Sequence, residues 1–215
     1  YEVIAVLPDN EKVSELNGIG CHVILTPLER RGMNPIKDLG LFRRYFQLIK
    51  KEKPSLVITY TIKPNVYGGL VCRLLTIPYA ANITGLGTTF QNQGLLRKIV
   101  VVLYKMGLKK AKVVYFENQE NREILIDEGI VRENQTCLLN GAGVNLEHFS
   151  VFDYPAEDGA THFLFIGRVM QEKGVDELFG AMKKLYDEGF AVTLDVLGYY
   201  EEDYEKQIEM YTKEG

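Results

Sequence analysis

The chain has 215 residues, a formal net charge of −4, 46% hydrophobic residues and 25% charged residues. Such a composition is typical of folded, water-soluble domains. The acidic balance argues against a nucleic-acid partner, because nucleic-acid-binding proteins generally present a basic face. The longest strongly apolar run, residues 99–104, is too short to span a bilayer. Neither a nucleic-acid-binding protein nor a membrane-spanning protein is expected.

The cysteines and histidines give no sign of a metal site. Cys21, Cys72 and Cys137 are far apart, lie in apolar surroundings and form no C-x-x-C pair. They are expected to be buried free thiols in a reducing compartment. The three histidines share no helical spacing that suits a metal ion. No bound metal is expected.

The first two thirds of the chain alternate between strand-like and helix-like segments. The expected strands are 3–7, 21–26, 56–60, 79–83, 113–116 and 136–139. The expected helices are 9–17, 39–51, 65–75, 95–110 and 118–128. Asn118 is the expected N-cap of the last helix, and Gly129 ends it. Continuous apolar strands separated by helices predict an α/β fold with a parallel sheet covered on both faces.

The segment 150–161 interrupts this rhythm with charged residues, proline and glycine, and is expected to be an interdomain linker. Strands at 162–166 and 192–197 and helices at 175–188 and 201–213 are expected after it. The predicted domains are therefore 1–152 and 160–215. Two strands and two helices cannot close a doubly wound domain, so we expect the chain to be a fragment. The first strand leads into a turn without glycine, so an opening strand–loop–helix unit is also expected to be missing.

The stretch 163–178 reads FLFIGRVMQEKGVDEL and predicts an anion site. A strand ends at Gly167, a polar turn holds Arg168 and Lys173, and a helix begins after Gly174. A helix N-terminus offers unpaired N–H groups to an anion. Arg168 can fork onto two phosphate oxygens while Lys173 acts as a mobile charge, which suits a diphosphate. The alternative is that both cations are only solvated surface residues.

The motif I-G-R at 166–168, followed by E-K-G-V at 172–175, resembles the nucleotide-diphosphate motif of the retaining glycosyltransferases of family 4 (group 1). The resemblance implies a GT-B fold with two Rossmann-like domains. It also implies that Gly167, Arg168 and Lys173 contact the diphosphate of a nucleotide-sugar donor. The resemblance covers nearly the whole chain, and this motif is its most specific part.

The segment 61–69, TIKPNVYGG, follows the expected strand 56–60. Loops at the carboxyl ends of parallel strands are common ligand sites. Lys63 can meet an anionic group, and Asn65 and Tyr67 can hydrogen-bond sugar hydroxyls. The alternative is a proline-initiated helix whose glycines allow close packing. The segment resembles one found in the bacterial capsule and O-antigen subgroup of the family, which favours a sugar-binding cleft.

Two further loops follow expected strands. Thr84 and Gly85 belong to a T-G-L-G segment that occupies the acceptor side in the same subgroup. Asn140 and Gly141 resemble the turn at the family's domain boundary. From the residues alone a plain glycine turn explains the first loop equally well, and the resemblance favours the acceptor side. For the second loop the alternative is a simple Asn-Gly turn.

The stretch 95–114 contains six cations and no acidic residue. The cations are Arg97, Lys98, Lys105, Lys109, Lys110 and Lys112. A basic helix with apolar residues can lie on an anionic bilayer surface. The alternative is a core helix whose exposed side is basic.

The chain departs from the family pattern at two places. Tyr60 and Thr61 stand where the family carries a histidine, and Gly198-Tyr199-Tyr200 replaces a G-D-G segment. The family's acidic pair is expected beyond Gly215. No catalytic residue is therefore assigned, and the 215 residues alone are expected to be inactive.

The resemblance implies an enzyme that moves a hexose or N-acetylhexosamine from a UDP-sugar, with retention, to a lipid-diphosphate-linked glycan. It implies cell-surface polysaccharide synthesis by a peripheral protein on the cytoplasmic face of the membrane, with no cofactor. A sugar-nucleotide epimerase shares the GT-B architecture and is the enzymatic alternative. A fragment that only binds an anion or a membrane is the non-enzymatic alternative.

Overall fold

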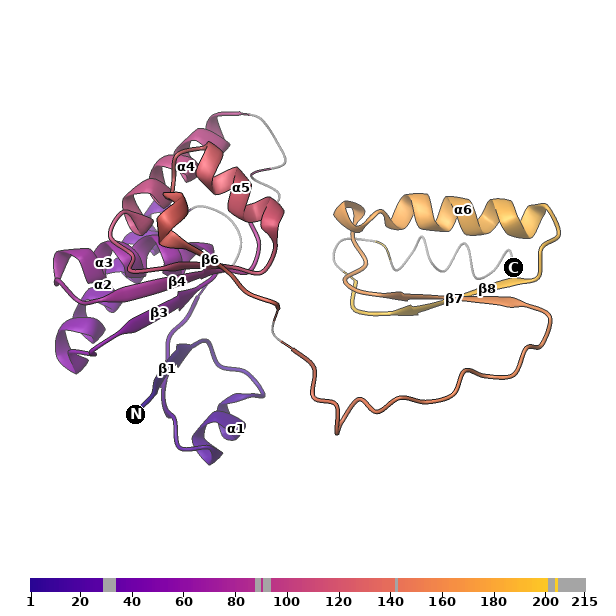
Figure 1. Ribbon diagram of the computed structural model, residues 1–215, viewed down its shortest axis with the longest axis horizontal. Coiled ribbons are helices and arrows are strands. Elements are labelled where there is room, and N and C mark those ends of the chain that lie inside the picture. The colour runs from indigo at the N-terminus through magenta and orange to yellow at the C-terminus, as the bar shows by residue number, and fades with distance from the viewer. Residues whose placement is uncertain (29–33, 88–89, 91–93, 142, 201–203, 205–215) are drawn as a thin grey trace. The chain divides into compact units, whose positions relative to one another are not determined.

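The computed structural model describes residues 1–28, 34–87, 90, 94–141, 143–200 and 204 (Figure 1). They divide into two compact units, Tyr1–Val144 and Asn145–Gly215, each with parallel strands of its own. The helix expected at 201–213 falls almost entirely outside the described residues.

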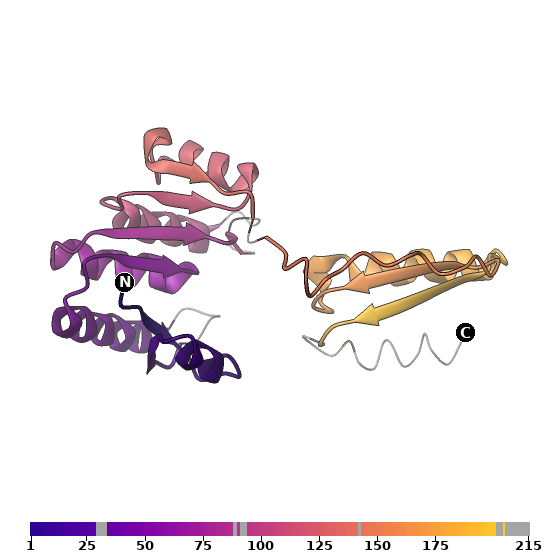
Figure 2. The ribbon, with the colours of Figure 1, turned by 60° about the horizontal axis from the view of Figure 1, so that its bottom comes forward.

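All strand pairs among the described residues of unit 1 are parallel, as predicted (Figure 2). The strands are β1 (Ile4–Leu7), β2 (His22–Leu25), β3 (Val57–Tyr60), β4 (Tyr79–Ile83), β5 (Val114–Phe116) and β6 (Thr136–Leu138). β1 pairs with β2, while β3, β4, β5 and β6 form a second sheet in chain order. Since neighbouring strands run in one direction, the loops that leave β3, β4, β5 and β6 lie along one edge of this sheet.

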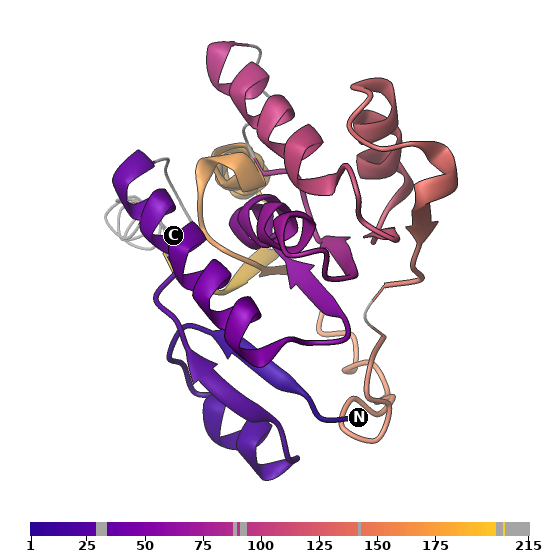
Figure 3. The ribbon, with the colours of Figure 1, turned by 90° about the vertical axis from the view of Figure 1, so that its left-hand side faces the viewer.

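Helices connect these strands. They are α1 (Val13–Gly18), α2 (Pro35–Glu52), the π-helical turn η1 (Pro64–Gly68), α3 (Gly69–Leu74), α4 (Leu95–Leu108), α5 (Gln119–Asp127) and the short 3-10 turn η3 (Glu133–Gln135). The helices α2, α3 and α4 lie side by side, with α3 in the middle (Figure 3). The N-cap predicted for α5 is confirmed, because Asn118 Oδ1 accepts a hydrogen bond from the Asn121 N–H at 2.8 Å.

The helix α2 begins four residues earlier than predicted. The side chain of Asn34 accepts hydrogen bonds from the N–H groups of Ile36 and Lys37, both at 3.2 Å. Pro35 occupies the first turn, where its missing N–H costs nothing. The prediction relied on apolar spacing, which starts at Leu39, whereas the cap determines where the helix starts.

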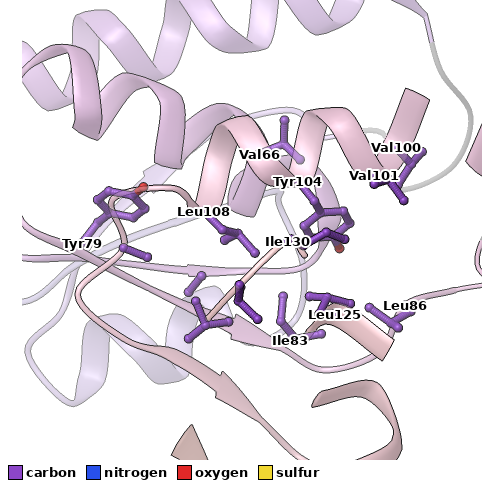
Figure 4. Close-up of a cluster of buried hydrophobic side chains, with 14 of the residues drawn as sticks. Val66, Tyr79, Ile83, Leu86, Val100, Val101, Tyr104, Leu108, Leu125 and Ile130 are labelled. Atoms are coloured by element: carbon purple, nitrogen blue, oxygen red, sulfur yellow. The ribbon is translucent and has the colours of Figure 1, made fainter. Parts of the chain in front are cut away.

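The main core lies between the sheet β3–β6 and its helices (Figure 4). Tyr104 and Leu108 of α4 are fully buried against Ile83 of β4 and Leu125 of α5. Cys72 also belongs to this core, and burial raises the pKa of its thiol to about 12. The prediction of buried free thiols is confirmed for Cys72 and is wrong for Cys21 and Cys137, which are free but only half-buried.

The prediction that both faces of the sheet are covered holds for one face of β3. Thr59 is buried and its methyl group lies 3.0 Å from the position that a Cβ on Gly68 of η1 would take. Ile58 and Tyr60, which alternate with Thr59 and so point to the other face, are about half exposed. Among the described residues, that face of β3 is therefore only partly covered.

Unit 2 contains β7 (Thr161–Ile166), the 3-10 turn η4 (Gln171–Lys173), α6 (Val175–Asp187) and β8 (Val192–Leu197). β7 and β8 are parallel along their whole length. A small core joins them to α6 through Val169, Val175 and Phe179. This is the β–α–β arrangement predicted for the stretch after the linker.

Two glycines fix the contact between α4 and the η1–α3 segment. A Cβ on Gly107 would lie 2.7 Å from the Val66 Cα, and a Cβ on Gly69 would lie 2.3 Å from the Gly107 carbonyl oxygen. Real Cβ atoms do not approach backbone so closely, so both positions require glycine.

We predict that Gly107→Ala lowers the free energy of unfolding by about 2 kcal/mol, because backbone must move to admit the methyl group. Gly40→Ala is the matched control. Gly40 lies in α2, is exposed and has no atom within 4 Å of the place that a methyl group would take, so alanine there should stabilise by about 0.5–1 kcal/mol. Urea unfolding of the two variants measures both effects, and equal midpoints would contradict the close contact.

Candidate functional site

The turn between β7 and α6 carries the predicted diphosphate residues. Gly167 follows β7 directly and donates its N–H to the Leu197 carbonyl at 3.0 Å. Arg168 comes next and is half-buried, while Lys173 ends η4 and is exposed. Gly174 then takes a left-handed conformation, with φ of +71°, and α6 begins. Both cations therefore lie on one short turn at the carboxyl end of β7.

Gly167 and Gly198 directly follow β7 and β8, and they allow the two chains to remain close beyond the last residues of the strands. A Cβ on Gly198 would lie 1.8 Å from the Gly167 carbonyl oxygen. Beyond them, the Val169 N–H donates to the Tyr199 carbonyl at 3.1 Å. Backbone hydrogen bonds to the last residue of β8 and to the chain just after it thus anchor the turn on both sides of Arg168.

The N-terminus of α6 is less favourable to an anion than the sequence suggested. No side chain caps it, so its first N–H groups are not used by a cap. Asp176 and Glu177, however, occupy its first turn and are exposed. Their negative charges offset the positive end of the helix dipole. The helix N-terminus therefore adds little positive potential to that of Arg168 and Lys173 on this turn.

In unit 1 the loops that follow β3 and β4 meet. The Ile62 side chain lies 3.7 Å from the position that a Cβ on Gly87 would take. Thr61, immediately after β3, has φ of +66°, a conformation that a β-branched residue rarely adopts. Such strain is frequently found at functional sites. No pattern in the sequence predicts it.

Lys63 is not a free cation. Its Nζ lies 2.8 Å from Asp38 Oδ1, and the two side chains are only 12% and 9% exposed. Asp38 comes from the first turn of α2, so the pair ties α2 to the loop after β3. A hollow of about 330 Å³ opens beside the pair. Its lining consists of Pro27, Lys37, Asp38, Gly40, Leu41, Arg44 and Lys63.

Tyr67 joins the same pair. Burial, the negative charge of Asp38 and a hydrogen bond to Asp38 raise the pKa of Tyr67 to about 12. The hydroxyl is therefore protonated at neutral pH and acts as a donor. Asp38 thus receives two partners, Lys63 and Tyr67, from the segment that the sequence assigned to a sugar-binding cleft. Asp38 itself was missed, because nothing in the local sequence around it predicts a partner so far along the chain.

Asn65 lies deeper than predicted. It is 1% exposed, and its amide donates to the Asn82 carbonyl of β4 at 3.0 Å. Asn82 in turn donates to Glu117 Oε1 at 3.4 Å, just after β5. Neither Asn65 Oδ1 nor Asn82 Oδ1 has a hydrogen-bond partner among the described residues. Buried polar atoms normally have a hydrogen-bond partner. These two amide oxygens can therefore each still accept a hydrogen bond at this edge of the sheet.

The remaining residues predicted for a cleft lie at or near the surface of unit 1. Thr84 is exposed and Gly85 is half-buried, directly after β4. Asn140 and Gly141 are exposed beyond β6, and Gly141 has φ of +87°. These residues share the carboxyl edge of the sheet with the Lys63 loop. Within the part of the chain that the structure describes, no three metal-ligating side chains gather.

The six cations predicted for a membrane surface fall into two groups. Arg97 is half-buried and forms an ion pair with Glu128. Lys98, Lys105, Lys109, Lys110 and Lys112 are exposed. No described helix is long and apolar enough to cross a membrane.

We predict that Asp38→Ala lowers the free energy of unfolding by about 3 kcal/mol, since it leaves Lys63 buried without its carboxylate. Asp38→Leu combined with Lys63→Met should recover most of this loss, because it removes both charges. Urea unfolding of the single and double variants measures the difference. If Asp38→Ala unfolds at the same urea concentration as the parent, the pair contributes nothing.

Sequence comparison identifies relatives along most of the chain. The sequence model of the glycosyl transferase 4-like family matches residues 1–118. The Campylobacter jejuni N,N'-diacetylbacillosaminyl-diphospho-undecaprenol alpha-1,3-N-acetylgalactosaminyltransferase is 28% identical over 202 residues, which is 86% of this chain and 54% of the relative. The Staphylococcus aureus capsular polysaccharide biosynthesis glycosyltransferase CapM is 22% identical over 210 residues, 92% of this chain and 54% of that protein. The chain thus spans about half the length of these relatives.

Solved structures agree on the fold. The Anabaena HepE protein in complex with UDP-glucose has a TM-score of 0.70 at 16% identity, covering 98% of this chain and 57% of that one. The fold is therefore α/β of the GT-B type, with Rossmann-like parallel sheets, as predicted. With a family match over more than half of its residues, the chain belongs to the glycosyl transferase 4-like family.

Proposed function

We propose that this chain is part of a glycosyltransferase of cell-surface polysaccharide synthesis. The enzyme transfers a hexose or N-acetylhexosamine from a UDP-sugar, with retention, to a lipid-diphosphate-linked glycan. The observation that supports the proposal most strongly is the Gly167–Lys173 turn, which places two cations at the carboxyl end of β7. The chain that carries this turn belongs to the glycosyl transferase 4-like family. Ligands of open α/β sheets bind at this end of the strands.

The donor class is supported by the turn and by the fold. A diphosphate requires concentrated positive charge, which Arg168 and Lys173 supply on a turn anchored by backbone hydrogen bonds. The structurally similar HepE protein was solved with UDP-glucose. Together these observations favour a uridine diphosphate sugar as the donor.

The acceptor class is supported by the relatives. The Campylobacter relative is named for an acceptor built on diphospho-undecaprenol, and CapM is named for capsular polysaccharide biosynthesis. In unit 1, the residues proposed for the acceptor are Thr84, Gly85, Asn140 and Gly141, which follow strands at the carboxyl edge of the sheet. Lys63 and Tyr67, also predicted for this cleft, are engaged by Asp38 and are proposed only to hold the loop after β3 in place. Asn65 helps to hold this edge in place, because its side-chain amide donates a hydrogen bond to the Asn82 carbonyl of β4.

Transfer breaks the bond between the anomeric carbon and the β-phosphate oxygen of the donor. The acceptor hydroxyl oxygen bonds to the same carbon, UDP leaves with the electron pair, and the departing phosphate oxygen takes up the hydroxyl proton. Negative charge therefore grows on the diphosphate as the bond breaks. Cations placed in advance around that charge stabilise the transition state. In this proposal Arg168 and Lys173 have that role, and no cofactor is required.

The family match favours a transferase over the two alternatives. A sugar-nucleotide epimerase would share the fold, but the chain matches a glycosyltransferase family along residues 1–118. An anion-binding or membrane-binding protein without activity would not need the polar, partly strained edge of unit 1 beside Thr61 and Asp38.

We predict that Arg168→Ala and Lys173→Ala in the full-length protein each weaken use of the donor. Losing one charge-assisted contact should cost about 1.5–3 kcal/mol, or roughly 10–150-fold in kcat/KM for the UDP-sugar. Initial rates of sugar transfer to a lipid-diphosphate-linked glycan measure the effect.

Lys184→Ala is the matched control, because Lys184 is an exposed lysine of α6 that lies 3.9 Å from the exposed Glu188, away from the turn. Its donor kinetics should equal those of the parent. Unchanged donor kinetics in both Arg168 and Lys173 variants would remove the diphosphate assignment. A parent enzyme that isomerises the UDP-sugar without transferring it would favour the epimerase.

A further inference from the structure

Among the described residues, Glu117 is a half-buried carboxylate without a cationic partner. The acids of unit 1 that are at least partly buried in the described part of the chain are Asp38, Glu52, Glu117 and Glu128. Each of the others forms an ion pair, with Lys63, Lys51 and Arg97 respectively. Glu117 accepts a single hydrogen bond from the described residues, donated by the Asn82 side-chain amide at 3.4 Å. Because partly buried polar groups are normally satisfied, Glu117 keeps hydrogen-bonding capacity that the fold does not use.

Glu117 lies between the two loops proposed to contact the acceptor substrate. Its strand, β5, pairs with β4 on one side and with β6 on the other. The pairing of β4 with β5 ends at Phe116, so Thr84 and Glu117 follow at the same level. On the other side the Leu139 N–H donates to the Phe116 carbonyl at 2.7 Å, one residue before Asn140. Glu117 is therefore at the middle of the edge to which the acceptor substrate was assigned.

A buried amide network holds the Glu117 carboxylate in place. Asn82, which is 8% exposed, donates to Glu117 Oε1, and its own carbonyl accepts from the Asn65 amide at 3.0 Å. Asn65 is 1% exposed. The side-chain oxygens of both asparagines have no hydrogen-bond partner among the described residues. The unused capacity of this cluster thus consists of hydrogen-bond acceptors, and a group that meets Glu117 must be a donor.

We propose that Glu117 binds a hydroxyl group of the sugar at the acceptor end of the lipid-diphosphate-linked glycan. The inference rests on the proposed function and names a residue that determines its specificity. A sugar hydroxyl donates to a carboxylate oxygen in a charge-assisted hydrogen bond. The diphosphate of the acceptor substrate is negatively charged and is repelled by Glu117, so it lies elsewhere. A metal ion suits the cluster less, since no three metal-ligating side chains gather within the described residues.

Such a contact distinguishes sugars that differ in one hydroxyl. Asn82 occupies Oε1 of Glu117, which leaves Oε2 for the sugar. When the hydroxyl is missing, the carboxylate is desolvated by the substrate without receiving a hydrogen bond in return, and the analogue is rejected. Asn82 does not touch the sugar in this arrangement, but it orients the carboxylate that does.

Initial rates of the full-length protein with octyl-diphosphate-linked sugars test the proposal. The acceptor substrates carry glucose, galactose, N-acetylglucosamine or N-acetylgalactosamine, and the UDP forms of the same sugars are the donors. Glu117→Ala should raise the KM for the acceptor substrate that the parent uses by roughly 10–100-fold, because a charge-assisted hydrogen bond is lost. The KM for the UDP-sugar should change by less than about twofold, because Glu117 belongs to unit 1 and the proposed diphosphate turn to unit 2.

Acceptor substrates in which one hydroxyl is replaced by hydrogen separate a direct contact from a structural role. With the parent, one deoxy sugar should lose about as much kcat/KM as Glu117→Ala loses with the intact sugar. With Glu117→Ala the same deoxy sugar should lose little more, because the contact is already absent. If every deoxy sugar lowers kcat/KM by the same factor in the parent and in Glu117→Ala, Glu117 meets no hydroxyl and the proposal is wrong.

Glu120→Ala is the matched control. Glu120 is an exposed acid in the first turn of α5, three residues beyond Glu117, so its replacement removes the same charge from the same region. Its kinetics with the acceptor substrate should equal those of the parent. If Glu117→Ala does not fold, Glu117→Gln replaces it, since glutamine keeps the size of the side chain and an oxygen for the Asn82 hydrogen bond. A parent-like KM for the acceptor substrate in the folded Glu117 variants would overturn the proposal.

A binding measurement separates this proposal from the proposed function. Saturation-transfer difference NMR detects contact of the same octyl-diphosphate-linked sugars without turnover. If the parent binds one of them but transfers no sugar, the proposed function is contradicted, and a loss of the signal in Glu117→Ala but not in Glu120→Ala still supports the site. If the parent transfers sugar and the signal is unchanged in Glu117→Ala, the site alone is wrong. A parent that neither binds nor uses any of these sugars contradicts both proposals.

Discussion

The approach of α4 to the η1–α3 segment is the contact on which the arrangement of unit 1 depends most. Gly69 and Gly107 allow the backbones to meet where no Cβ fits. Tyr79 of β4 then donates its hydroxyl to the Gly107 carbonyl at 2.6 Å, which joins the sheet to the same point. This contact fixes the segment that carries Lys63 and Tyr67 on one side. It also fixes the position of α4 on the other.

The positively charged side chains of this protein have two roles that the sequence alone does not distinguish. Lys63 and Arg97 look like available cations, but each is paired with a carboxylate that lies far away along the chain, Asp38 and Glu128. Their role is to join elements. Lys105 and Lys173, by contrast, are exposed, so their charges are accessible to a binding partner. Counting cations in a stretch therefore overestimates the charge that remains for binding.

Local chemistry explains which features could be predicted. The Asn118 cap spans three residues, and the parallel strands follow from apolar runs between helices, so both were predicted correctly. The start of α2 was missed, although its Asn34 cap is local, because apolar spacing was given more weight than the cap. The Asp38 partner of Lys63 is different, since only the folded chain brings the two together. The strained Thr61 also depends on how β3 passes into η1.

The alternation of buried and exposed side chains along β3 has one more physical consequence. Thr59 points to the helices and is buried, while Ile58 and Tyr60 on the other face are half exposed. Parallel strands that are apolar on both sides are normally covered on both sides, and leaving such side chains in water forgoes the stabilisation that burial provides. Among the described residues, this face of β3 therefore gains less stabilisation from burial than the face toward η1.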